Sequence, residues 1–127
     1  MVDFRLSEEQ VMIRDMAREF CDEEVIPNAE EWDKSGTYPL DAISKAHELG
    51  LLNVTIPEKY GGAGMSTVDE IIICEELSRG DPGFGTASYH TMLASLPILT
   101  GGTEEQKSEY LGRVASGKLA AYCVTEP

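Results

Sequence analysis

The sequence has little cysteine, little histidine and few basic residues, and each shortage argues against a class of site. Its three cysteines, Cys21, Cys74 and Cys123, lie far apart without a CxxC pair, so neither a disulfide framework nor a zinc site is indicated. The two histidines, His47 and His90, have no second histidine or paired cysteine at ligand spacing. We therefore expect a reducing intracellular setting and no bound metal.

Positive charge is also scarce, because 10 lysines and arginines stand against 23 aspartates and glutamates, for a formal net charge of -13. Such a charge disfavours contact with nucleic acid phosphates and with anionic lipid. No apolar run approaches the ~18 residues that cross a bilayer, and the N-terminus lacks the charged-then-apolar pattern of a signal peptide. We expect neither a nucleic acid nor a membrane partner, and a cytoplasmic location.

What the 127 residues do contain is a series of well-marked helix starts. Each begins with a side chain that can accept a hydrogen bond from the first free N–H groups of a helix. This residue is followed either by a side chain three positions on that can bond back to it, or by a proline in the first turn. These starts lie at residues 7–10, 66–69, 81–82 and 103–106. A hydrophobic content of 42% over this length indicates one compact domain with one core.

Apolar residues recur at three and four positions after these starts, which predicts amphipathic helices. The first helix is predicted to run until Pro27 interrupts it near Val25, and the acidic piece at 28–34 is compatible with helix around Trp32. A second helix is predicted to end at Gly50 with a left-handed cap. Residues 51–56 form a short apolar stretch that fits an extended conformation.

The second half of the sequence predicts three more helices and a tail. Four consecutive apolar residues at 71–74 indicate a central, buried helix. The segment 82–93 is rich in small residues, which fits either close packing between helices or a ligand lying against this helix. The last helix stops before Gly117, and the apolar run 119–124 is typical of a β-strand with nothing to pair with, so the polypeptide is expected to continue.

No catalytic constellation emerges from the residues themselves, so no catalytic residue is assigned. Ser7, Ser66 and Thr103 fit helix caps better than nucleophiles, because no GxSxG or comparable frame surrounds them. His47 is expected to face solvent. The glycines at 61–64 predict a surface loop, since they match neither a P-loop nor a GxGxxG pattern.

Several segments, in order along the chain, resemble the N-terminal helical domain of the acyl-CoA dehydrogenases. They are FRLSEEQ at 4–10, ELGL at 48–51, IPEKYGG at 56–62, EELSR at 75–79, GTEEQK at 102–107 with YL at 110–111, and AYCVTEP at 121–127. Each is modest alone, whereas their shared order covers nearly the whole sequence. The resemblance implies an all-α, up-and-down, bundle-like domain over residues 1–118. Residues 119–127 would begin a middle β-domain and form a β-prone tail.

The resemblance also implies an activity. Members of that family remove hydrogen from Cα and Cβ of an acyl-CoA thioester, and pass electrons to FAD and then to electron-transferring flavoprotein. They are homo-oligomers, and their catalytic base comes from a C-terminal domain. This chain alone is therefore expected to be inactive and to bind FAD weakly. The alternatives are a non-enzymatic helical module for protein interaction and a stand-alone acyl-CoA binder.

Carried over by position, the family's site residues fall into two groups in this sequence. Tyr122, Val124 and Thr125 match residues that lie along the flavin. Thr86, Tyr89 and His90 match the helix that forms the floor of the acyl pocket. Tyr89 is bulky for this place, which favours a shorter or branched acyl group.

Overall fold

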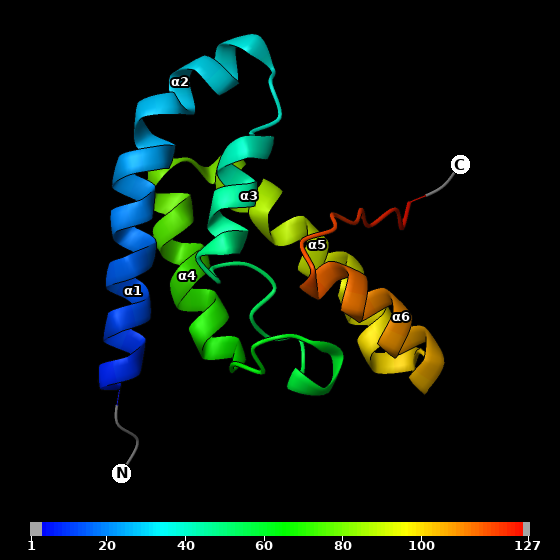
Figure 1. The fold of residues 1–127 in the computed structure, drawn as a ribbon. Helices are drawn as coiled ribbons and strands as arrows, with labels where there is room; N and C mark the ends of the chain where they lie inside the picture. Colours follow the sequence, from blue (N-terminus) through cyan, green and yellow to red (C-terminus); the bar gives the residue numbers. More distant parts are fainter. Residues whose placement is uncertain (1–3, 126–127) are drawn as a thin grey trace.

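The computed structural model describes residues 4–125, and this part of the chain is built from α-helices joined by short turns (Figure 1). The α-helices are α1 (Glu8–Phe20), α2 (Ile26–Ser35), α3 (Leu40–Glu48), α4 (Thr67–Gly80), α5 (Pro82–Gly101) and α6 (Glu104–Ala115). A π-helical turn, η1 (Cys21–Val25), and a 3₁₀ turn, η2 (Glu58–Tyr60), complete them. Since no strand occurs between residues 4 and 125, the predicted all-α class is confirmed.

The helix starts lie where the sequence predicts them. Ser7, Ser66 and Thr103 each accept a hydrogen bond from the backbone N–H three residues on, and the residue there bonds back to the cap. Asp81 caps α5, with Pro82 in its first turn. These starts are readable from the sequence because each cap is a bond between near neighbours.

Pro27 does not end the first helix, contrary to the prediction. The chain passes from α1 through η1 directly into α2, which has Pro27 in its first turn and carries Trp32. A proline within a helix lacks a donor and clashes with the carbonyl four residues earlier. The π turn spaces that region more widely, so the helix bends and continues (Figure 1).

Two helices end in a Schellman motif, the arrangement in which a left-handed residue lets two backbone N–H groups reach back to the last turn. At the end of α3, Gly50 (φ 72°) bonds to the His47 carbonyl and Leu51 to the Ala46 carbonyl, which confirms the predicted cap. At the end of α6, Gly117 (φ 91°) bonds to Val114 and Lys118 to Arg113 in the same pattern.

Residues 51–56 are not extended as predicted but form consecutive turns. Asn53 takes a left-handed φ of 57°, which breaks the alternation that a strand needs. Leu51, Val54 and Ile56 are all buried. The apolar residues in this stretch therefore pack into the core although the backbone is not extended.

α4 lies at the centre of the molecule, in contact with α1 on one side and α5 on the other, and α6 packs along the far part of α5 (Figure 1). One core cluster joins α1, η1, α3 and α4 to the start of α5. A second, smaller cluster joins η2, α5 and α6 around Ile56, Met92 and Leu111. α5 thus spans both clusters. Within residues 4–125, no helix has both the length and the apolarity needed to cross a membrane.

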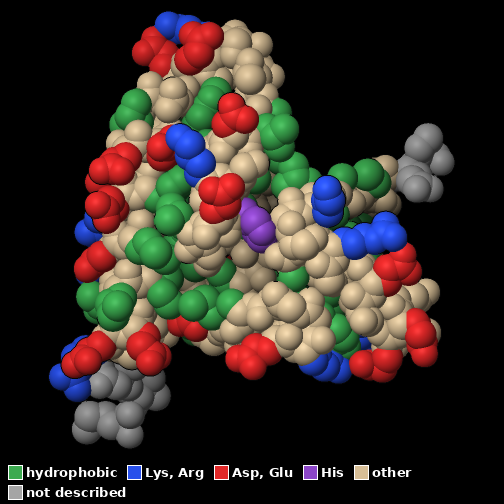
Figure 2. All heavy atoms as spheres, viewed as in Figure 1, with side chains coloured by type: hydrophobic (Ala, Val, Ile, Leu, Met, Phe, Trp, Pro, Cys, Tyr) green, Lys and Arg blue, Asp and Glu red, His purple; other side chains and the backbone are tan. Residues whose placement is uncertain are grey.

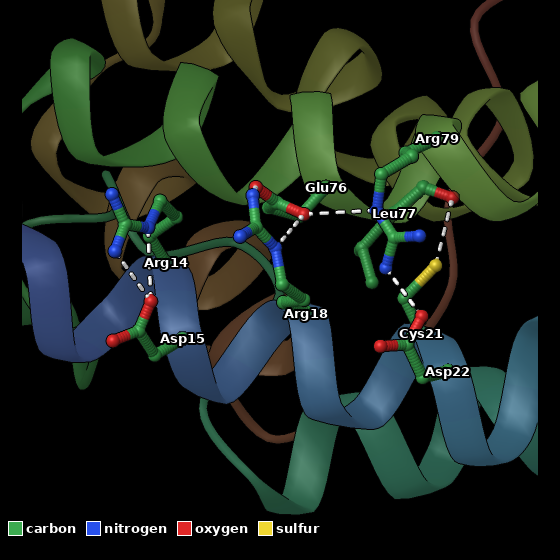
Figure 3. A network of polar contacts seen from close by, with 8 residues as sticks. All are labelled: Arg14, Asp15, Arg18, Cys21, Asp22, Glu76, Leu77 and Arg79. Atoms are coloured by element: carbon green, nitrogen blue, oxygen red, sulfur yellow. Dashed lines mark hydrogen bonds and ion pairs between the residues drawn. The ribbon is translucent and has the colours of Figure 1, made fainter.

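A network of charged side chains ties α1 to α4 (Figure 3). Glu76 is only 6% exposed and accepts from Arg18 of α1 (2.6 and 3.0 Å) and from Arg79 (3.1 Å). Arg79 in turn reaches Asp22 at 2.5 Å. The hydrogen bonds from Arg18 and then Arg79 lower the pKa of Glu76. This pairing lets a carboxylate occupy the interface between two helices.

Much of the acidic excess lies on the outer side of the helices. Figure 2 shows carboxylate side chains along the edge formed by α1 and α2, where Glu19, Asp22 and Glu23 are exposed. These residues recur at helical spacing, and Asp22 also pairs with Arg79 of α4. The arrangement agrees with a solvated helix face.

Candidate functional site

α5 supplies one wall of the candidate site, and its first turns lie very close to α4. The Asp81 carboxylate accepts from the N–H groups of Gly83 (3.3 Å) and Phe84 (2.7 Å), which fixes where the helix begins. A Cβ atom added to Gly85 would lie 2.9 Å from Cβ and 3.0 Å from Cα of Ser78, and closer still to the Ser78 hydroxyl. At this position, the small residue therefore serves packing between helices.

The three predicted acyl-contacting residues do not share one face of α5. Thr86 and His90 lie one turn apart on its exposed side, where the Thr86 hydroxyl donates to the Pro82 carbonyl (2.8 Å). Tyr89 is half-buried on another side, in a hollow that Glu70 and Cys74 also line. The structure thus brings Thr86 and His90 together and places Tyr89 apart from them.

Burial shapes the chemistry of the hollow around Tyr89. It raises the pKa of the Tyr89 phenol, and the nearby charge of Glu70 acts in the same direction. It also raises the pKa of Glu70, against the opposing effect of the Thr55 hydroxyl, which donates to its carboxylate (3.3 Å). The hollow thus favours the neutral forms of both groups.

The tail after α6 turns back across α5. The Ala120 N–H donates to the hydroxyl of Thr91, a buried residue of α5, at 3.3 Å. Beyond this bond, residues 121–125 have no regular secondary structure and lead away from the helices (Figure 1). A β-prone segment without a neighbouring strand is expected to behave in this way. Residues 119–127 were predicted to begin the middle β-domain, and the last two of them, Glu126 and Pro127, lie outside the described residues.

The tail and α5 enclose a hollow of about 400 Å³ that joins the two groups of predicted residues. Its lining consists of Tyr38, His90, Leu119, Ala120, Ala121 and Tyr122. His90 is one of the residues predicted to contact the acyl tail, and Tyr122 is one of the residues predicted to contact the flavin. These two therefore meet at one place, while Val124 and Thr125 lie further along the tail.

Tyr38 forms the third wall of this hollow, from the turn before α3. Its hydroxyl donates to the Ala87 carbonyl of α5 (3.4 Å), and burial raises the pKa of the phenol. The sequence did not single out Tyr38 or Thr91, because both approach the tail from distant parts of the chain. No local pattern marks such residues.

The tail exposes apolar side chains and main-chain groups to solvent. Tyr122 is 46% exposed and Val124 is 64% exposed, so both offer apolar surface. Among residues 4–125, the main-chain groups of 121–125 form no hydrogen bond with another segment. An isoalloxazine ring has apolar faces and a polar edge that bonds to such groups. Tyr122, Val124 and Thr125 could therefore hold it.

The described residues contain no group of three or more His, Cys, Asp and Glu side chains close enough to hold a metal ion. The three cysteines are free thiols, with Cys21 buried and Cys123 exposed. His47, predicted to face solvent, is instead half-buried, and its Nδ1 atom is enclosed without a hydrogen-bond partner. That correction follows from the end of α6, which lies against this side of α3.

Residues 7–118 match the sequence profile of the family described as "Acyl-CoA dehydrogenase, N-terminal domain". A probable medium-chain specific acyl-CoA dehydrogenase of Caenorhabditis briggsae, described as mitochondrial, is 45% identical over 99% of this chain and 31% of its own length. An acyl-CoA dehydrogenase of Bacillus subtilis is 41% identical over 96% of this chain and 33% of its own. The chain thus spans about a third of the length of these curated relatives.

Solved structures agree with this assignment. The chain superposes on butyryl-CoA dehydrogenase from Megasphaera elsdenii with a TM-score of 0.86 and 34% identity, over 99% of this chain and 34% of that one. An acyl-CoA dehydrogenase from Bacillus anthracis, solved with FAD, gives 0.82 and 38% over 100% and 22%. A chain from a structure described as electron transferring flavoprotein of Acidaminococcus fermentans gives 0.82 and 43% over 91% and 31%. The chain belongs to the acyl-CoA dehydrogenase family, and residues 7–118 are its N-terminal domain.

Proposed function

We propose that this chain forms the floor of the acyl pocket and part of the flavin site of an FAD-dependent acyl-CoA dehydrogenase. The enzyme would be an oxidoreductase that desaturates an acyl-CoA thioester between Cα and Cβ. Family membership supports this reaction class, and the Bacillus anthracis relative was solved with FAD. The chain spans only about a third of its relatives, so the activity is proposed for the protein that contains it.

Within that enzyme, the residues of this chain would bind and orient rather than react. The main chain of 121–125 and the side chains of Tyr122, Val124 and Thr125 would hold one side of the flavin, and Thr86 and His90 would border the acyl tail. FAD, when bound, supplies the acceptor for the hydride that leaves Cβ. We assign the base that removes the α-proton to the part of the relatives' length beyond this chain, in agreement with the absence of any catalytic constellation in the sequence.

The observation that carries the proposal is the hollow between α5 and the tail. Two residues with separate predicted roles, His90 and Tyr122, line the same hollow, together with the aromatic ring of Tyr38. An acyl chain against α5 and a flavin ring against the tail would then be neighbours. Reacting groups must lie side by side for hydride transfer, which is what such an arrangement provides.

The experiment compares the 127-residue chain with a fusion in which it replaces the matching third of the Bacillus subtilis relative. We expect the fusion to hold FAD and to reduce an acceptor dye when given acyl-CoA, and the chain alone to show no turnover and only weak FAD binding. A fusion that folds, contains all its helices and yet binds no flavin would contradict the proposal. It would favour the alternative of a helical interaction module without enzymatic activity.

Acyl-chain preference is a separate proposal, which rests on Tyr89. We propose that the end of the acyl tail reaches the hollow between α4 and α5 that Tyr89 lines. Because the Tyr89 ring is bulky and half-buried, it limits the depth of this hollow, so the substrate would be a short or branched acyl group. Replacing Tyr89 with Ala in the fusion should shift the kcat/KM optimum towards longer acyl-CoA thioesters. A matched Tyr110→Ala variant, whose change lies on α6, should leave the chain-length profile unchanged. Fastest turnover of long-chain substrates by the unmodified fusion would contradict the proposal.

Partners and location are proposed from the same relationships. We propose electron-transferring flavoprotein as the electron acceptor, supported by the related chain in a structure described by that name, and a homo-oligomeric assembly as in the family. We also propose a reducing compartment, with the cytoplasm as first choice, supported by the three free thiols. The Caenorhabditis briggsae relative is mitochondrial, so organelle fractionation is the direct measurement.

A further inference from the structure

The end of α3 meets the end of α6 where His47 lies against Gly117. His47 lies in the last turn of α3, where its carbonyl accepts from Gly50 in the Schellman motif. Its imidazole faces the left-handed glycine of the other Schellman motif. A Cβ atom on Gly117 would lie 2.8 Å from Cδ2 and 2.9 Å from Nε2 of His47. The ring therefore occupies the space that a side chain at residue 117 would need.

This contact is one of packing and not of hydrogen bonding. The Nδ1 atom of His47 is enclosed and has no hydrogen-bond partner among the described residues. A buried nitrogen without a hydrogen-bond partner costs stability. If Nδ1 served a hydrogen bond, a donor or acceptor would lie beside it. What the ring contributes at this place is its shape, which fills the space in front of a residue without a side chain.

The position of Gly117 gives the contact its importance. Gly117 is the residue at which the chain stops following α6 and turns towards the tail, and its φ of 91° favours glycine. Three residues on, the Ala120 N–H bonds to Thr91 of α5 (3.3 Å). Between them, Leu119 lines the hollow beside His47 as well as the hollow that contains His90 and Tyr122. The start of the tail is thus held from α3 and from α5.

We propose that His47 is a positioning residue for the flavin-binding tail: its imidazole, packed on Gly117, sets the direction in which residues 118–125 leave α6. The hydrogen bond from Ala120 to Thr91 is the second point that fixes this direction. The inference rests on the proposed function, since it assigns a purpose to the direction of the tail. Without the ring, the tail would lose its contact with α3 and sample a wider range of orientations.

The direction of the tail can be measured in the 127-residue chain without any flavin. The chain has a single tryptophan, Trp32, which is stacked on Phe84 in the core, and an exposed Cys123 in the tail. With Cys74 replaced by Ser throughout, a fluorescent acceptor on Cys123 reports the distribution of its distance from Trp32 by time-resolved energy transfer. The variants are His47→Ala, His47→Phe, and Glu48→Ala as the exposed neighbouring control.

We expect a narrow distance distribution for the unmodified chain, for Glu48→Ala and for His47→Phe, because phenylalanine keeps a ring against Gly117 and removes the unpartnered nitrogen. His47→Ala should broaden the distribution while the circular dichroism of the helices is retained. An unchanged distribution in His47→Ala would overturn the proposal. So would a broadening that His47→Phe fails to reverse, since the role would then not be one of packing.

The same variants in the fusion with the Bacillus subtilis relative separate this inference from the proposed function. If the tail spreads over about ten orientations of which one accepts flavin, the apparent Kd for FAD rises about tenfold in His47→Ala and recovers in His47→Phe. A broadened tail with unchanged FAD affinity would leave His47 as the residue that directs the tail, but would refute the role of the tail in flavin binding. A raised Kd with an unchanged distance distribution would refute the positioning role itself.

Discussion

Replacing Gly85 with Ala tests whether the small residues of α5 serve contact with α4. The added Cβ would lie 2.9 Å from Cβ and 3.0 Å from Cα of Ser78, and it would meet the Ser78 hydroxyl directly. Because a backbone-attached atom cannot swing aside, the two helices must separate. Overpacking of this kind costs about 1–3 kcal/mol, whereas alanine gains about 1 kcal/mol over glycine in helix propensity.

The net expectation is a loss of about 1 kcal/mol, and of about 2 kcal/mol at most, in the free energy of unfolding. With an m-value of about 1.5 kcal/mol/M, a loss of about 1 kcal/mol lowers the urea midpoint by roughly 0.7 M. Trp32 fluorescence is the natural probe, because the indole stacks on Phe84, next to Gly85, with ring centroids 5.6 Å apart. The matched control is Gly101→Ala at the other end of α5, where an added Cβ meets nothing within 4 Å.

Gly101→Ala should leave stability unchanged or raise it by up to about 1 kcal/mol, since alanine restricts the unfolded chain. The reasoning is refuted if Gly85→Ala is as stable as the unmodified chain, or if both variants lose stability equally. The first result would mean that the helices adjust without cost. The second would point to a general need for glycine in α5, unrelated to the contact with Ser78.

Four further changes test the polar contacts. Glu76→Gln should cost about 1–2 kcal/mol at pH 7, because two arginines lose a paired carboxylate, and urea unfolding measures it. Because the pKa of Glu76 is lowered in the folded state, its carboxylate stabilises the domain at pH values above its pKa in the unfolded chain. This stabilisation is lost as pH falls through the pKa of the folded state, so the free energy of unfolding should depend less on pH at acid pH in Glu76→Gln. Glu70→Gln on the same helix should have the opposite effect. Burial raises the pKa of Glu70, so its charge costs stability as pH rises, and the amide should stabilise the domain at pH 7. If the two glutamine variants change stability in the same direction, the assignment whose variant departs from its expected sign is contradicted. Ser66→Ala should cost about 1 kcal/mol through loss of the α4 cap, whereas Ser44→Ala, at an exposed site outside any cap, should change thermal stability little.

Features that depend on near neighbours could be predicted from the sequence. The caps at Ser7, Ser66 and Thr103 were found because their partners lie three residues away. Pro27 shows where such reasoning fails. A proline normally ends a helix, yet here a π turn precedes it and the helix continues. Burial of η1 residues such as Val25 in the core stabilises this turn, and no local sequence pattern reveals that burial.

The candidate site was predictable only in part. The family resemblance pointed to α5 and the tail, and the structure brings His90 and Tyr122 to one hollow. It also separates Tyr89 from His90, because adjacent positions on a helix point about 100° apart and α4 covers one of them. Tyr38 joins the hollow from a turn far away in the chain.

The sequence by itself determined the helical class, the positions of most helix ends and the apolar stripes, because all of these arise from interactions within a few residues. Only the tertiary structure decided which small residues serve packing, how His47 comes to rest on Gly117, and which residues share a hollow with the tail. These are contacts between segments separated by dozens of residues. They depend on which faces of the helices pack together. Their geometry follows from close packing of the whole domain, which no local stretch of the chain encodes.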